Sequence, residues 1–271
     1  MAFVLTRFRS TQWLVAAFAF LVSAAVAGAL ILRSEQQDLA GARSQAAELA
    51  SDHSQTLQRG IERALGASYA MAAFVRQAQG QVAGFEAVAT EMLPFYPGIS
   101  ALSLSPDGVI SNVVPLAGNE KILGFNQLKD PKQNREARLA RDAAKLTLAG
   151  PMKLAQGGTG LVGRLPVFLN DDQSQPVFWG FSNVTLRFPE ALASARLSQL
   201  VDKGYAYELW RTVPESGERQ TIESFGNLPL DQPVNHMLEL PNGQWNLSLA
   251  PVRGWERSEG FPIKLSIGLL L

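Results

Sequence analysis

A run of twenty uncharged residues, Trp13 to Leu32, limits what this chain can fold into more than any other feature. As an α-helix the run rises about 30 Å, which matches the hydrocarbon core of a bilayer. Arg7 and Arg9 precede it, so the positive-inside bias places residues 1–12 in the cytoplasm. The run therefore predicts a transmembrane helix, with the remainder of the chain outside the cytoplasm.

A cleaved signal peptide is the alternative to a retained anchor. Ala25-Val26-Ala27 offers small residues in an arrangement typical of a cleavage site. The apolar region of a signal peptide is normally about 7–15 residues long, however, and this one is longer. The length favours a retained anchor, and both alternatives leave the following residues outside.

The end of the sequence carries another apolar segment, which begins within residues 259–271. This segment is too short to span a bilayer. It fits either a final buried strand or the start of a second transmembrane helix. We expect the second, because two membrane segments that bracket an external domain form a receptor layout. The expected location is the bacterial inner membrane, with residues 33 to about 260 in the periplasm or extracellular space.

Residues 33–79 predict one long stalk helix, because they contain no proline and are rich in helix-forming residues. An apolar seam with steps of three and four runs from Leu39 to Val75, with a stutter between His53 and Ile61. The seam predicts a parallel homodimer, a helix that packs on its own domain, or both in different parts. His53 lies on the seam and is expected to be a packed or interfacial residue.

The pattern changes after Gly80 to short strands and helices. Strands are expected at 99–104, 109–114, 161–168 and 177–186, with helices at 85–93 and 131–147. A connecting helix at 189–201 precedes further strands at 205–212, 221–225, 234–240 and 244–250. Antiparallel strands with helices on one face predict an α+β fold of two PAS-like modules, a membrane-distal one at 80–187 and a membrane-proximal one at 188–258.

Composition excludes several functions. The chain has no cysteine and two histidines, so it lacks most ligands for a metal site and most general bases. It carries 24 basic and 24 acidic residues, so no positive excess is available for nucleic acid. We expect no enzyme activity, metal, cofactor or nucleic-acid partner.

Several strings in order resemble the CHASE sensory domain over about residues 85–187. They are Tyr96-Pro97-Gly98-Ile99, Pro106-Asp107-Gly108, Pro115 to Glu120, Gly150-Pro151, Leu154 to Gly160, Arg164 to Phe168 and Phe178 to Phe181. The resemblance implies an extracytoplasmic sensor that binds a small molecule in its distal module. It also implies a cytoplasmic output such as a histidine kinase, a diguanylate cyclase or another cyclic-di-GMP enzyme.

The resemblance also suggests binding residues. Plant relatives bind cytokinins and hold the adenine with an aspartate before the main helix of the module, a place that Asp130 occupies here. Asp130 is equally suited to cap that helix. Arg164 stands where the plant pattern has a threonine. A guanidinium in a pocket favours a carboxylate or phosphate over a neutral purine, although Arg164 could also be a surface or interface charge.

Five further residues complete the predicted site: Asn119, Glu120, Phe125, Phe168 and Phe178. Asn119 and Glu120 could line the rim of the pocket or cap a short helix. An ectodomain with a structural or protein-binding role is the main alternative to a small-molecule sensor.

Overall fold

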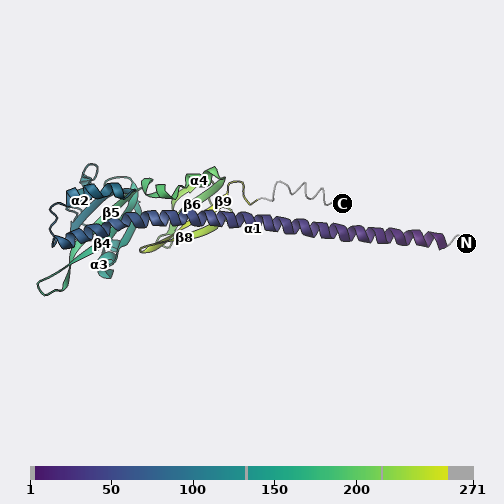
Figure 1. Ribbon diagram of the computed structural model, residues 1–271, viewed down its shortest axis with the longest axis horizontal. Coiled ribbons are helices and arrows are strands. Elements are labelled where there is room, and N and C mark those ends of the chain that lie inside the picture. The colour runs from purple at the N-terminus through teal and green to yellow at the C-terminus, as the bar shows by residue number, and fades with distance from the viewer. Residues whose placement is uncertain (1–3, 132–133, 215, 256–271) are drawn as a thin grey trace.

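A single helix organises the molecule. The computed structural model describes residues 4–131, 134–214 and 216–255, so the predicted segment at 259–271 lies outside the described residues. Helix α1 (Val4–Gln77) continues without a break from the apolar run into the stalk (Figure 1). Its N-terminal part is, among the described residues, the one stretch long and apolar enough to cross a membrane, and none of that stretch is buried.

The membrane-distal part is built around a five-stranded antiparallel sheet with the strand order β2-β1-β5-β4-β3. Its strands are β1 (Ile99–Pro106), β2 (Asn112–Val114), β3 (Thr147–Lys153), β4 (Thr159–Asn170) and β5 (Pro176–Arg187). Its helices are α2 (Phe85–Met92), η1 (Leu93–Phe95), η2 (Glu120–Ile122) and α3 (Asn134–Ala143). The chain between β2 and β3, with η2 and α3, covers the face of this sheet that is turned away from α1.

The membrane-proximal part is a four-stranded antiparallel sheet with the order β7-β6-β9-β8. Its strands are β6 (Tyr205–Thr212), β7 (Arg219–Phe225), β8 (Val234–Leu240) and β9 (Gly243–Pro251). Two short helices, η3 (Glu190–Ala195) and α4 (Ser198–Asp202), link it to the distal sheet. Two antiparallel sheets joined to a long helix confirm the predicted α+β fold of PAS-like modules.

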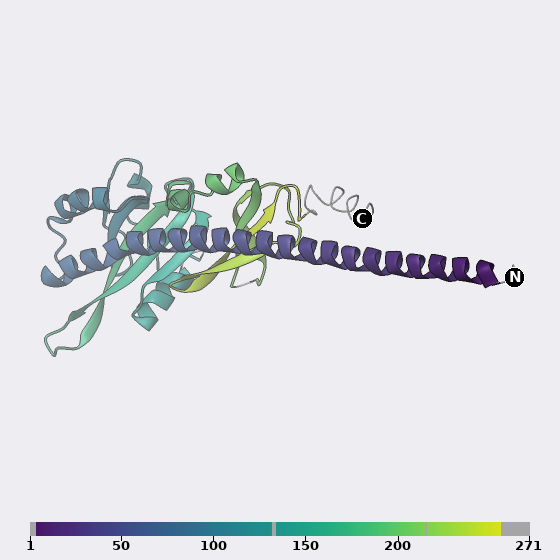
Figure 2. The ribbon, with the colours of Figure 1, turned by 45° about the vertical axis from the view of Figure 1, so that its right-hand side comes forward.

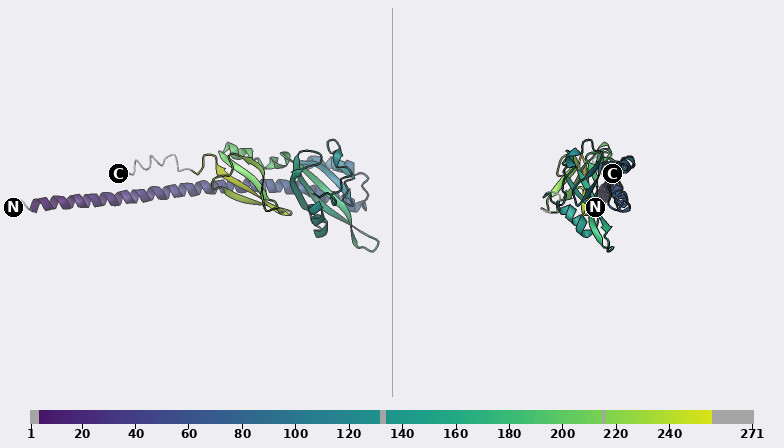
Figure 3. Two further views of the ribbon diagram at one scale, coloured as in Figure 1. Left: turned by 180° about the vertical axis from the view of Figure 1, so that it is seen from behind. Right: turned by 90° about the vertical axis from the view of Figure 1, so that its left-hand side faces the viewer.

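The two sheets lie one after the other along the same helix (Figures 2 and 3). The backbone of Glu239 in β8 donates to Gln58 of α1 at 3.2 Å. Farther from the membrane, a Cβ atom at Gly163 in β4 would lie 2.2 Å from the Leu65 side chain of α1, so the absence of a side chain at Gly163 leaves room for Leu65 against the sheet.

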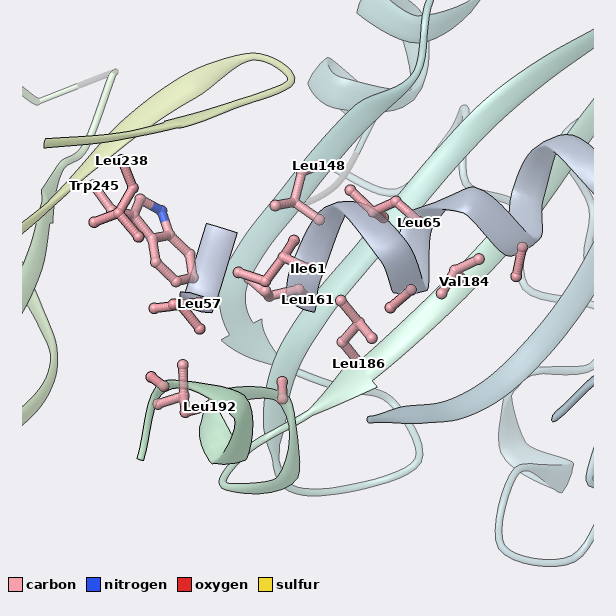
Figure 4. Close-up of a cluster of buried hydrophobic side chains, with 14 of the residues drawn as sticks. Leu57, Ile61, Leu65, Leu148, Leu161, Val184, Leu186, Leu192, Leu238 and Trp245 are labelled. Carbon is pink, nitrogen blue, oxygen red and sulfur yellow. The ribbon is translucent and has the colours of Figure 1, made fainter. Parts of the chain in front are cut away.

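One hydrophobic core joins α1 to both sheets. Leu57 of α1 lies beside Trp245 and Leu238 of the proximal sheet, whereas Ile61 lies beside Leu161 of the distal sheet (Figure 4). The predicted seam is therefore used within the chain from Ala46 onward, because most of its later positions are buried in the monomer. Those positions are Ala46, His53, Leu57, Ile61, Ala64, Ser68, Met71 and Val75. Of the two seam alternatives, packing of the helix on its own domain is the one that the fold uses here.

Three predicted elements are wrong in extent. The predicted connecting helix 189–201 is divided into η3 and α4, because Arg196 between them has a left-handed backbone (φ 47°). The predicted helix 131–147 is shortened to α3, which ends before Ala144 with its left-handed backbone (φ 51°), and Thr147 already belongs to β3. The predicted strand 109–114 keeps only Asn112–Val114, because Val109 and Ile110 turn away to pair with the segment around Asn126.

Candidate functional site

The distal sheet has two different faces, because side chains alternate along each strand. Leu104, Leu161 and Val184 point to the core shared with α1. The opposite face carries a row of polar residues at matching positions of four neighbouring strands. This polar row consists of Ser103, Asn183, Arg164 and Thr147, and each member is paired in register with the next.

A small cavity of about 30 Å³ lies over the polar row. Its lining is half polar and half apolar: Ser103, Gln127, Gln156, Arg164, Asn183, Thr185, Ile110, Ile122, Phe125, Leu154, Ala155 and Val162. The strands provide the floor, whereas the segment between β2 and β3 and the turn before β4 provide the roof. A volume of this size is enough for about one water molecule.

Arg164 is the unusual residue of this cavity. Its side chain is only 1% exposed, and arginine is almost never fully buried unless it is paired. Its Nε atom donates to Gln127 Oε1 at 3.0 Å. Burial lowers the pKa of Arg164 to about 10, and the charges of Glu136 and Asp130 offset part of that effect. The cavity therefore contains a desolvated cation held in place by an amide.

Neighbouring polar groups continue the network beneath the cavity. Asn183 Nδ2 donates to Ser105 Oγ at 2.7 Å, and Gln127 Nε2 donates to the same hydroxyl at 3.3 Å. Asn183 Oδ1 is buried and has no hydrogen-bond partner in the part of the chain that the structure describes. A buried acceptor without a donor is costly, so this face is equipped to accept a hydrogen bond from a ligand or a water molecule.

The structure places the seven predicted site residues at four locations. Arg164 and Phe125 line the cavity, and burial excludes the alternative of a surface charge for Arg164. Asp130 is half-buried outside the cavity lining, close enough for its charge to act on Arg164. Its carbonyl accepts from the backbone of Asn134 at 2.8 Å, at the start of α3.

The other four predicted residues do not line the cavity. Phe168 and Phe178 form an edge-to-face pair at 5.7 Å, farther along the same face of the sheet. Asn119 is buried and donates to the carbonyl of Pro115 at 2.9 Å, which supports a turn. Glu120 is exposed, and hydrogen bonds from the backbone of residues 120 and 118 lower its pKa. Their role as ligand contacts stays a prediction.

Sequence reasoning missed the partners of Arg164. Gln127, Asn183, Ser103 and Thr185 all line the cavity but were not singled out. The available signal was polar residues at every second position of otherwise apolar strands, as in Ser103-Leu104-Ser105. No comparable signal pointed to Gln127, which lies in an irregular loop.

A larger groove of about 870 Å³ lies elsewhere, between α1 and the η3–α4 linker. It is bounded by charged residues of both signs with exposed side chains, and His53 Nδ1 lies 2.6 Å from the carbonyl oxygen of Ala195 beside it. An open, mixed-charge groove resembles a surface for a protein segment. The enclosed cavity with a buried cation is the better candidate for a small ligand.

A family model of the CHASE domain matches residues 53–219, which is more than half of the 271 residues. The chain belongs to the CHASE domain family. CHASE domains are extracytoplasmic sensory domains rather than catalytic ones. The match covers the distal sheet, the linker and the first strand of the proximal sheet, so the cavity lies inside the family region, as does the groove apart from Leu49 and Asp52.

Solved structures with a similar fold come from extracellular receptors. An extracellular ligand binding receptor from Desulfohalobium retbaense has a TM-score of 0.59 and 14% identity over 76% of this chain. The chain spans only 40% of that receptor. The extracellular domain of rpHK1S-Z16, named as a histidine kinase, has a TM-score of 0.50 and 14% identity, covering 78% of this chain and 94% of that one. No curated protein matches the sequence of this chain.

Proposed function

We propose that this CHASE protein is the sensory part of a membrane receptor, and that its distal cavity binds a small anionic molecule through Arg164. The observation that carries the proposal is a buried guanidinium in the floor of a polar cavity. A guanidinium in a desolvated cavity can hold a carboxylate or phosphate by bidentate, charge-assisted hydrogen bonds, which are stronger away from bulk water. Burial is the largest cause of the lowered pKa of Arg164.

The size of the cavity limits the ligand. About 30 Å³ admits little more than a water molecule, so a metabolite enters only if the roof moves away from the sheet. The roof is a long connection made of η2, α3 and irregular segments, and such segments are the usual place for conformational change. Binding would thus be coupled to a displacement of the roof, which a receptor requires.

Strand β3 offers a path from the cavity to the proximal sheet. Thr147 at the end of the polar row donates to the Glu136 carbonyl in α3 at 3.1 Å. The next residue, Leu148, donates its backbone N–H to Asn242 Oδ1 in the β8–β9 turn at 2.5 Å. Arg211 of β6 donates to the carbonyl of Gly150. A movement of the roof that displaces β3 would therefore displace the proximal sheet.

The charge of Glu136 acts on Arg164 and on Arg211, which lie at the two ends of this path. It raises the pKa of Arg164 in the cavity and also that of Arg211 in the proximal sheet, each against a larger lowering by burial. An anion bound at Arg164 would add a second negative charge to the surroundings that Arg164 shares with Glu136, so binding would also alter the electrostatic environment of Arg211.

The proximal sheet in turn is attached to the stalk near the membrane. The Arg43 guanidinium lies 4.7 Å from the centre of the Trp255 ring, and Arg43 also donates to Gln232 Oε1 at 2.7 Å. The proposed receptor lies in the bacterial inner membrane with residues 33 to about 260 in the periplasm. It acts as a parallel homodimer and regulates a cytoplasmic output, either a histidine kinase or a cyclic-di-GMP enzyme.

Thermal unfolding of the detergent-solubilised chain against carboxylates, phosphates, amino acids and purines tests the proposal. An anion at a hundred times its dissociation constant should stabilise the protein by about 2.7 kcal/mol. The stabilisation should vanish in Arg164→Met and persist in Arg141→Met, a control that removes an exposed arginine paired with Asp142 on α3. Equal stabilisation of both variants would place the ligand elsewhere, and no response to any anion would favour a protein partner.

A further inference from the structure

The groove between α1 and the η3–α4 linker has two walls with a floor between them. One wall is α1 from Leu49 to Ala64, and the other is the linker from Glu190 to Lys203. The floor between them is apolar and includes Ile61, Leu186 and Ala191. An elongated groove with an apolar floor and a charged rim fits a helix better than a compact metabolite.

The charged side chains of the rim are arranged in order. Asp52 and Arg63 are eleven residues apart, about three turns, so they lie on the same face of α1. Glu190, Arg196 and Lys203 stand on the linker wall. Within residues 4–131, 134–214 and 216–255, none of these five side chains makes an ion pair. The groove thus holds complementary charges apart.

The linker runs in the opposite direction to α1, which fixes the level of each charge. Ser194 lies beside Gly60, where an added Cβ would be 2.4 Å from its hydroxyl oxygen, whereas Ala195 bonds to His53. Glu190 therefore lies toward the level of Arg63. Arg196 and Lys203 lie toward the level of Asp52.

The membrane restricts how a second copy can approach. Two copies anchored in one bilayer by the same end of α1 can be related by a two-fold axis only along the membrane normal. Because α1 continues from the apolar segment into the groove, the two α1 helices would then be roughly parallel and level with each other. Asp52 of the second copy would arrive at the level of Arg196 and Lys203, and its Arg63 at the level of Glu190, with opposite signs in each case.

We propose that this groove is the dimer interface, and that the Asp52–Arg63 face of each α1 packs into the groove of the other copy. The inference rests on the homodimer of the proposed function and specifies its contact surface. The proposed contact face lies beside the seam expected from the sequence, because most seam positions from Ala46 onward are buried inside each monomer and only some of them line the groove. Linker and stalk of both copies then meet at the junction of the two sheets, where the signal passes.

Disulfide crosslinking of the full chain in membranes tests the surface, because the chain has no cysteine of its own. Thr56→Cys lies between Asp52 and Arg63 on the groove face, whereas Glu62→Cys is also exposed but about 120° away around the helix. Since a disulfide requires Cα atoms within about 7 Å, Thr56→Cys should form crosslinked dimers about tenfold more than Glu62→Cys.

Charge reversal tests the ion pairs. In the Thr56→Cys background, Arg63→Glu should lower the yield of crosslinked dimer severalfold, and adding Glu190→Arg should restore it. Strong crosslinking at Glu62→Cys instead would overturn the proposed surface and keep the dimer. No crosslinking at either position would overturn the dimer itself, while the anion response of Arg164 is measured separately. If neither charge change alters the yield of crosslinked dimer, the proposed ion pair between Arg63 and Glu190 is excluded.

Discussion

Both sheets pack against α1, but the face turned away from α1 is covered differently in each of them. The distal sheet is covered there by the long segment between β2 and β3, which encloses a cavity around one buried cation. The proximal sheet joins β7 to β8 by the short segment 226–233 and places a buried anion, Glu208, on the corresponding face.

The buried charge of the proximal sheet is satisfied by its own neighbours. Glu208 accepts from Thr221 Oγ1 at 2.7 Å and forms a salt bridge with Arg219. The Arg219 guanidinium in turn lies 3.8 Å from the centre of the Trp210 ring, and Trp210 Nε1 donates to Ser248 Oγ at 2.8 Å. Charge, hydroxyl and aromatic ring thus satisfy one another on this face.

This contrast indicates where ligand-binding capacity comes from in such a receptor. Both sheets supply polar positions at every second residue, so the sheet alone does not create a site. The site is created by the chain segment that covers the sheet, which here is the segment between β2 and β3. The proximal sheet is thereby suited to transmit a displacement, and the distal sheet is suited to receive a ligand.

The largest expected effects concern the shared core. Leu57→Ala on the proximal side and Leu65→Ala on the distal side should each lower the free energy of unfolding by about 3 kcal/mol, because each leaves a cavity in a close-packed region. Urea unfolding should remain a single transition in both variants, since one core joins both sheets. Two separate transitions would show that the sheets are independent and would break the proposed mechanical coupling.

A second prediction concerns the sign of the effect at the distal charge. Arg164→Met should lower the free energy of unfolding of the ligand-free protein by about 1–3 kcal/mol, because it leaves the buried Gln127 Oε1 atom without the donor that Arg164 supplies. Urea unfolding without ligand measures it. A gain in stability would contradict this prediction, since the contact with Gln127 would then not stabilise the fold.

The proximal charge is expected to stabilise the fold through its own pair. Glu208→Gln keeps the shape and removes the charge that Arg219 pairs with, so it should lower the free energy of unfolding by about 1–2 kcal/mol. Arg141→Gln, which breaks the exposed pair with Asp142, should change it by less than about 0.5 kcal/mol. A gain of stability in Glu208→Gln would show that the pair with Arg219 does not satisfy the buried charge of the proximal sheet.

A smaller change than at Arg164 or Glu208 is expected at the contact between the sheets. Asn242→Ala removes the acceptor for the Leu148 N–H and should lower the free energy of unfolding by about 1 kcal/mol. We expect the anion to change the crosslinking yield of Thr56→Cys, and Asn242→Ala should reduce that change while the solubilised chain still binds the anion. An anion effect on the yield that is the same with and without Asn242→Ala would exclude this contact from the transmission path.

Much of the architecture was predictable because it depends on local patterns. The strands of the proximal sheet fall within a few residues of their predicted limits, since alternation and the Asn242-Gly243 turn are local signals. The extent of α3 was not predictable, because a left-handed residue at Ala144 ends the helix without a glycine or proline. The partner of the stalk seam was also not determined, since the same apolar spacing serves a coiled coil and an intramolecular core.

The candidate site was predictable only in part. Arg164 stood out because it is a charged residue within an apolar strand that resembles the sensory family. Its surroundings depend on contacts between distant segments, such as Gln127, which is 37 positions away in the sequence. Aromatic residues such as Phe168 lie on the correct face but beyond the cavity, which residue spacing alone does not reveal.

The central claim is that a small anion binds at Arg164, and titration calorimetry of the most stabilising anion tests it most directly. The account predicts one ligand per chain for the wild type and for Arg141→Met. For Arg164→Met it predicts binding weakened at least tenfold, or about 1.4 kcal/mol. Equal affinity in the wild type and Arg164→Met would contradict the account, because the buried guanidinium would then not contact the ligand.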